Sequence, residues 1–175
     1  MADTAADAPG KTSQGVREFT WQDYIGWGWM IIQTRMEADW KGIWNYAIPH
    51  LHASDETMAR TEAQLGFRLP ESYRDFLLAS NGWPCFYQNM TTLSTSDLLG
   101  GDLHKAGQTQ LELDECVEAM TSESVIAADH FPVAASLESI DVALMGRAGS
   151  PPSSKRPAAT TCRTEISSSL HSAPA

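Results

Sequence analysis

The chain has 175 residues, enough for one domain with a hydrophobic core but not comfortably for two. A hydrophobic fraction of 42% with six tryptophans indicates a globular protein. The three cysteines, Cys85, Cys116 and Cys162, are too widely spaced for a disulfide framework or a zinc knuckle and predict reduced thiols. No apolar run approaches the roughly 20 residues of a membrane-spanning helix, and the N-terminus does not follow the signal-peptide pattern. We therefore expect a cytoplasmic protein.

Charge is distributed unevenly along the chain. Residues 1–145 carry 21 acidic and 8 basic side chains, whereas residues 146–175 carry 1 acidic and 4 basic side chains. An acidic body disfavours nucleic acid and anionic membranes as partners. It favours a basic protein partner, although an acidic surface also serves solubility alone.

The N-terminal region is expected to be helical after a disordered segment, residues 1–15. Thr20 can cap a helix whose first turn contains Asp23. Apolar residues then recur at steps of three or four at Ile25, Trp29, Ile32, Met36, Trp40 and Trp44. Glycines predict two shorter helices or a break near residues 39–42. We interpret the stripe as core or interdomain packing, the alternative being a ligand-binding shelf.

A helix–loop–helix follows, with start and stop signals at each end. Ser54 is a predicted N-cap, and Gly66 ends the first helix in a left-handed conformation. Pro70 begins the second helix, and Asn81-Gly82 ends it.

The remaining elements are less sharply patterned. Residues 83–107 predict short strands and loops with a turn at Gly100-Gly101, and residues 113–120 predict an amphipathic helix. Residues 131–137 and 140–145 read as two strands whose mutual pairing stays open. Residues 146–175 are rich in Ser, Ala, Pro and Thr without aromatics, and predict a disordered tail.

The run from Ser54 to Trp83 resembles the signature of the SUKH superfamily, which includes Smi/Knr-like cell-wall synthesis regulators and bacterial toxin-immunity proteins. The matching residues are Glu62, Leu65, Gly66, Leu69, Pro70, Tyr73, Arg74, Phe76, Leu77, Asn81 and Gly82. The resemblance implies an α+β fold, with N-terminal helices and the helix–loop–helix packed on a mostly antiparallel sheet. Residues 16–145 would form this domain, including a tryptophan-rich helical extension over residues 19–48.

The chain departs from the family pattern after Met145, where family members usually continue with another strand or helix. The charge reversal at the same point leads us to the hypothesis of a truncated domain or a shifted reading frame. In either case the sheet would lack an edge strand.

The resemblance implies a protein-binding role without catalytic residues or a cofactor. The motif residues have structural roles in packing and in helix ends. His50 and His52 lack the ligand spacing of a zinc site, so no metal is expected. The leading hypothesis is an immunity protein that neutralises a cognate, basic secreted toxin. The alternatives are a regulatory or scaffold module in cell-wall synthesis or signalling, and an enzyme with an unrecognised site.

Two groups of residues are candidates for partner binding. The first is an acidic helix face, and Asp97 and Asp102 lie upstream of it. This face would steer a basic toxin by long-range attraction; the alternative is an ordinary solvated helix face. Its members are Glu112, Asp114, Glu115 and Glu118. The second is Trp83 with Phe86 and Tyr87, which are either exposed as a contact patch or buried. The sequence leaves the partner's identity and the oligomeric state open.

Overall fold

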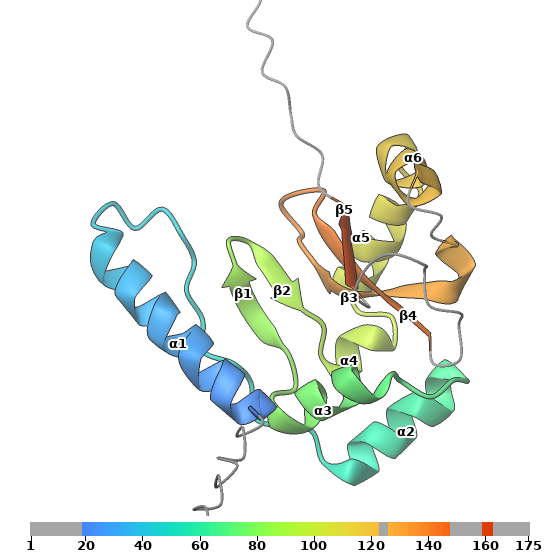
Figure 1. Cartoon of the computed structure of the whole chain (residues 1–175), viewed down its shortest axis with the longest axis horizontal. Coiled ribbons are helices and arrows are strands. Elements are labelled where there is room, and N and C mark those ends of the chain that lie inside the picture. The colour runs from blue at the N-terminus through green and yellow to red at the C-terminus, as the bar shows by residue number, and fades with distance from the viewer. Residues whose placement is uncertain (1–18, 123–125, 148–158, 163–175) are drawn as a thin grey trace, which may run out of the picture.

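A computed structural model describes residues 19–122, 126–147 and 159–162. The fold is α+β, as predicted: helices surround an antiparallel sheet of strand order β1-β2-β3-β4-β5 (Figure 1). The helices are α1 (Trp21–Ala38), α2 (Asp55–Leu65), α3 (Glu71–Ala79), α4 (Thr95–Leu98), α5 (Asp102–Leu111) and α6 (Asp114–Ser122), with a 3₁₀ turn, η1 (Ala127–Asp129). The strands are β1 (Trp83–Tyr87), β2 (Met90–Thr92), β3 (His130–Ala135), β4 (Val142–Gly146) and β5 (Ala159–Cys162).

Helix α1 begins as the sequence predicts. Thr20 and Asp23 form a reciprocal capping box, which satisfies backbone donors that the first turn leaves unpaired. The helix continues past its internal glycines and ends at Asp39, so the break lies where it was expected. No second helix follows, because Asp39 accepts hydrogen bonds from the backbone N–H groups of Ile43 (3.1 Å) and Trp44 (3.0 Å) and closes a turn instead. These backbone donors lower the pKa of Asp39.

The predicted apolar stripe is only half correct. Ile32 is buried and Ile25 packs against the core, but Met36 and Trp44 are exposed and Trp40 is 85% exposed. For Trp40 and Trp44 the reason is that the chain leaves the helical path at Asp39, so residues beyond it cannot continue a helical face. Most of the tryptophan-rich extension is therefore surface rather than core.

The helix–loop–helix is confirmed. Ser54 caps α2, and Gly66 ends it with a φ of 73°, a conformation that glycine adopts without strain. Pro70 is the N-cap of α3, one residue earlier than its predicted position. The stop signal is also correct, since α3 ends at Ala79 and Gly82 has a φ of 93°.

The region after α3 differs most from the sequence-based prediction. The β1–β2 hairpin is present, but much of the segment predicted as strands and loops forms α4 and the first half of α5. A capping box between Ser94 and Asp97 starts α4, a signal that the fading apolar periodicity concealed. Helix α5 packs so closely on β3 that a Cβ atom at Gly107 would lie 2.8 Å from Pro132. Only glycine fits at this position without a shift of its neighbours. The predicted helix over residues 113–120 is present as α6.

The two predicted C-terminal strands pair antiparallel as β3 and β4. Residues 159–162, which lie in the predicted tail, form β5 and pair with β4, so the described sheet continues past β4. The other residues of the predicted tail, and residues 1–15, lie outside the described residues apart from 146 and 147. Residues from α2, α3 and β3, among them Met58, Leu77 and Phe131, form the main core.

Candidate functional site

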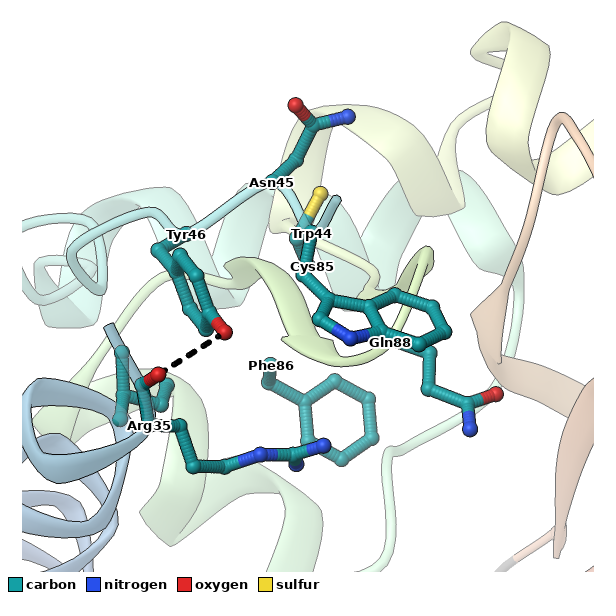
Figure 2. Close-up of a pocket in the computed structure, with 8 residues that line it drawn as sticks. Arg35, Trp44, Asn45, Tyr46, Cys85, Phe86 and Gln88 are labelled. Atoms are coloured by element: carbon teal, nitrogen blue, oxygen red, sulfur yellow. Dashed lines mark hydrogen bonds between the residues drawn. The ribbon is translucent and has the colours of Figure 1, made fainter. Parts of the chain in front are cut away.

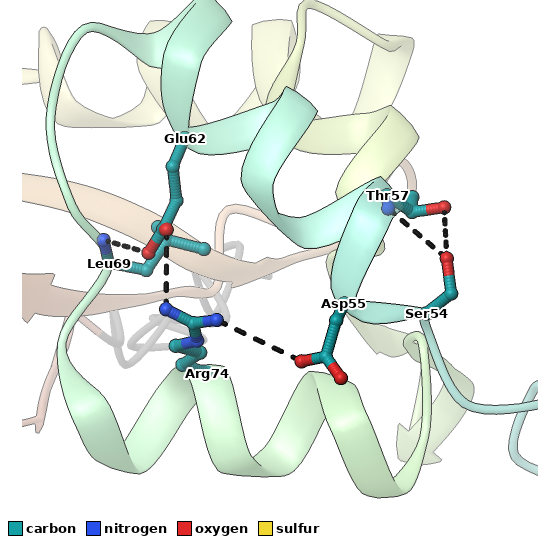
Figure 3. A network of polar contacts seen from close by, with 6 residues as sticks. All are labelled: Ser54, Asp55, Thr57, Glu62, Leu69 and Arg74. Atoms are coloured by element: carbon teal, nitrogen blue, oxygen red, sulfur yellow. Dashed lines mark hydrogen bonds and ion pairs between the residues drawn. The ribbon is translucent and has the colours of Figure 1, made fainter.

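The motif residue Glu62 joins α2 to α3 (Figure 3). One carboxylate oxygen accepts a hydrogen bond from the backbone N–H of Leu69 at 3.0 Å, and the other pairs with Arg74 at 3.4 Å. Arg74 also approaches Asp55 at 4.0 Å. Because both carboxylate oxygens of Glu62 have partners inside the fold, this network fixes the two helices rather than presenting a ligand site.

Other motif residues are also held within the scaffold. The buried Tyr73 hydroxyl donates to the carbonyl oxygen of Leu93 at 2.7 Å, and burial raises its pKa. The Asn81 side-chain oxygen accepts from the backbone N–H of Thr95 at 2.8 Å. Leu69 and Leu77 are buried in the core. The motif thus describes packing and hydrogen bonding.

The predicted acidic residues do not form a single helix face in the structure. Glu112 is the exposed C-cap residue of α5, and Glu118 is exposed on α6. Asp114 and Glu115 lie in α6, but their side chains are outside the described part of the structure. Of the two upstream acids, Asp97 is engaged in the α4 capping box, whereas Asp102 is exposed and pairs with Lys105 at 3.5 Å.

The three residues of the predicted aromatic contact patch differ in how far they are buried. Trp83 is buried, with its indole N–H donating to the carbonyl oxygen of Ala47 at 2.9 Å. Phe86 is half-buried and Tyr87 is exposed. Trp83 and Phe86 instead line a depression that the sequence pattern does not predict.

This depression, which we call the apolar groove, lies between α1, α3 and the sheet and has a volume of about 280 Å³. Trp21 and Tyr24 form a wall from α1, and Phe76 contributes from α3. The rings of Trp21 and Phe76 meet edge to face at a centroid distance of 5.4 Å, which joins the two helices. The other lining residues are Ile25, Ser72, Tyr73, Trp83, Phe86, Thr92, Val133, Ala134, Ala143 and Met145.

The polar atoms of the groove are mostly engaged within the protein. The Thr92 hydroxyl accepts from the backbone N–H of Trp83 at 2.6 Å, and the Tyr73 hydroxyl donates to Leu93. The remaining polar lining groups are the hydroxyl of Ser72, exposed on α3, and the Tyr24 hydroxyl and Trp21 indole N–H of α1. The groove therefore offers a partner an apolar surface, without an acid and base pair among its lining residues.

A second pocket of about 310 Å³ has a mixed lining that includes His50, Cys85, Asp97 and Glu138. Both carboxylates already accept hydrogen bonds, Asp97 in the α4 cap and Glu138 from the Asn89 amide at 2.7 Å. Within the described residues, the Cys85 thiol and the His50 ring form no hydrogen bond with each other. The pocket therefore lacks the thiol–imidazole pair of a cysteine nucleophile.

A small crevice lies where the segment after α1 returns toward the sheet (Figure 2). Arg35, Trp44, Tyr46 and Phe86 surround it, and the Tyr46 hydroxyl donates to the carbonyl oxygen of Arg35 at 3.3 Å. Its volume of about 10 Å³ holds one water molecule at most, so the crevice is too small for a ligand.

In the described residues, His, Cys, Asp and Glu side chains do not gather into a group of three or more that could hold a metal ion. Nor does any helix in the described ranges combine the length and apolar character needed to cross a membrane.

A model of the SMI1 / KNR4 family (SUKH-1) matches residues 52–139, half of the chain. The chain belongs to this family. The match begins just before α2 and ends after β3, so it contains the motif and most of the groove, while α1 lies outside it. SUKH proteins are generally non-catalytic and typically bind protein partners. Comparison with curated proteins and with solved structures gives no match for this SUKH-1 chain.

Proposed function

We propose that this SUKH-1 protein is an immunity protein that binds a cognate bacterial toxin in the cytoplasm and blocks it stoichiometrically, without catalysis. The observation that supports this role most directly is the apolar groove, an open surface with a wall of exposed aromatic residues. Transfer of apolar area from water to a protein interface drives association. Aromatic side chains such as Trp21 and Tyr24 are typical interface anchors.

The charge of the protein supports a basic partner. The net charge of −10 creates a negative field that attracts a positively charged protein before contact. Exposed Glu112 and Glu118 add to this field at the α5–α6 end of the molecule, away from α1 (Figure 1). We therefore assign steering to the acidic surface and the lasting contact to the apolar groove.

The second candidate is a regulatory or scaffold module in cell-wall synthesis or signalling. The family is compatible with both roles. The same groove would then hold an apolar segment of a host protein rather than of a toxin. The two proposals differ in one measurable property, because only a toxin arrests the growth of cells that lack the immunity protein.

The experiment is a capture from native lysate and secretome, with the full chain as bait and a groove variant beside it. Ser72→Trp fills the groove from an exposed position on α3 without removing a core side chain. Gln64→Trp, on the exposed surface of α2 and outside the groove lining, is the matched control for an added indole. Each captured protein is then expressed alone and together with each variant.

The proposal expects a captured protein that arrests growth alone, and growth restored by the wild type and Gln64→Trp but not by Ser72→Trp. A captured protein that does not arrest growth, but depends on the groove in the same way, favours the regulatory alternative. Restored growth with Ser72→Trp would show that the toxin does not bind in the groove.

A further inference from the structure

Helix α1 has two apolar faces. On the body side, Ile25 packs against the core, Ile32 is buried, and Gly28 lies against the Trp83 ring. On the other side, four large apolar residues have exposed fractions between 45% and 63%. These residues, which we call the outer face, are Tyr24, Trp27, Met30 and Ile31. A large apolar helix face is normally buried, and no described residue of this chain buries the outer face.

The spacing of the outer face fits helix pairing. Tyr24, Trp27, Ile31 and Thr34 follow one another at alternating steps of three and four residues. This is the spacing of the a and d positions along the seam between two packed helices. Phe19 extends the surface, since its ring lies 4.6 Å from that of Trp27 between centroids.

The charge pattern favours a second copy of this chain as the partner. Residues 24–36 contain no acidic residue and one basic residue, Arg35, and the acidic Asp23 and Glu37 flank this stretch, in a protein with a net charge of −10. Two copies repel each other over most of their surfaces, and they meet at least electrostatic cost where acidic side chains are few. An interfacial membrane helix needs a polar, basic face, which α1 lacks.

The exposed area is also sufficient. The outer face and Phe19 are five large side chains, each roughly half exposed. At about 100 Å² of exposed surface for each, they offer on the order of 500 Å² per chain. Two chains then bury on the order of 1,000 Å², the lower limit for a specific protein–protein interface.

We propose that the outer face of α1 binds the same face of a second copy, so that the protein is a homodimer joined by its α1 helices. This proposal goes beyond the immunity function and does not depend on it. Tyr24 belongs to both the outer face and the groove wall, whereas Trp27, Met30 and Ile31 do not line the groove. Each copy in the dimer therefore keeps its groove floor and the Trp21 part of the wall.

The test is sedimentation velocity of the full chain between about 1 and about 100 µM, because a dimer dissociates on dilution. The wild type is expected to sediment with twice the chain mass of 19.1 kDa. Trp27→Glu and Ile31→Glu place a charge in the interface and should raise the dissociation constant at least about 100-fold, giving monomers. Gln33→Glu adds the same charge at an exposed position outside the outer face and should remain dimeric.

Far-UV circular dichroism checks that the variants are folded, and the exposed Thr34→Glu is the second variant if either apolar substitution unfolds the chain. A monomeric wild type across this range overturns the proposal, as does a Trp27→Glu protein that stays dimeric. Flotation of a monomeric wild type with phosphatidylcholine vesicles would assign the outer face to a lipid surface instead. Because these measurements need no toxin, their failure is distinguishable from failure of the immunity proposal.

Discussion

Glu62 lies between two helices, and each of its carboxylate oxygens has a different partner. Its side chain is 15% exposed and that of Arg74 is 24% exposed, so water replaces a lost partner poorly. The pair formed by Arg60 and Glu56 provides a contrast, because those side chains are 63% and 85% exposed at a similar separation of 3.1 Å. The two pairs therefore differ in their contribution to stability because of burial and not because of distance.

We therefore predict that Glu62→Ala lowers the free energy of unfolding by about 2 kcal/mol, because it leaves the Leu69 N–H and the Arg74 guanidinium without their acceptor. Arg60→Ala should change it by less than about 0.5 kcal/mol. Urea unfolding followed by circular dichroism measures both. Equal losses in the two variants would show that the network around Glu62 contributes no more than a surface pair.

At the scale of elements, α1 is held to the body by a few close contacts. Its buried residue is Ile32, and Trp21 meets Phe76 at its N-terminal end. Between these, the Trp83 ring lies against Gly28, where a Cβ atom would be 2.9 Å from the ring. The ring cannot easily move away, because Trp83 is buried and its indole N–H is bonded to Ala47.

Two glycines in this helix make a matched pair for a stability measurement. Gly26 has no atom within 4 Å of an added Cβ, so Gly26→Ala should raise the free energy of unfolding by about 0.5–1 kcal/mol through helix propensity alone. Gly28→Ala gains the same helix propensity, but its added Cβ atom clashes with the Trp83 ring. The net effect should be a free energy of unfolding lower by about 1 kcal/mol. Thermal unfolding of both variants provides the comparison. A stabilising Gly28→Ala would mean that α1 does not pack on Trp83.

The elements also show how far sequence reasoning reaches. Local chemistry at Thr20, Ser54 and Gly66 located helix ends correctly, because a cap depends on residues only a few positions away. The apolar groove was not predicted, because its lining comes from segments more than 100 residues apart, such as Trp21 and Met145. Periodicity identified α1 as a helix but could not show which of its apolar faces the body covers.

For the whole molecule, the proposed division between acidic steering and apolar contact predicts separate kinetic effects. Replacing exposed Glu112 and Glu118 together by Gln should lower the association rate constant for a basic toxin and weaken its dependence on salt, with little change in dissociation. Ser72→Trp should raise the dissociation rate constant and leave the association rate constant nearly unchanged. Surface plasmon resonance between about 50 and about 300 mM NaCl measures both rates. An unchanged association rate in the double variant would remove the steering role from this surface.

The limit of the family match runs through the apolar groove. The α3 side and most of its floor belong to the matched part of the chain, where Phe76 and Val133 are packed into the core, while Ala143 and Met145 of β4 and the outer wall from α1 lie outside the match. Exchanging the exposed residues of α1 changes the shape of the wall and leaves core packing intact, whereas most changes in the floor disturb the fold. An inherited body with an exchangeable wall is a simple route by which related proteins could acquire different partners while keeping one fold.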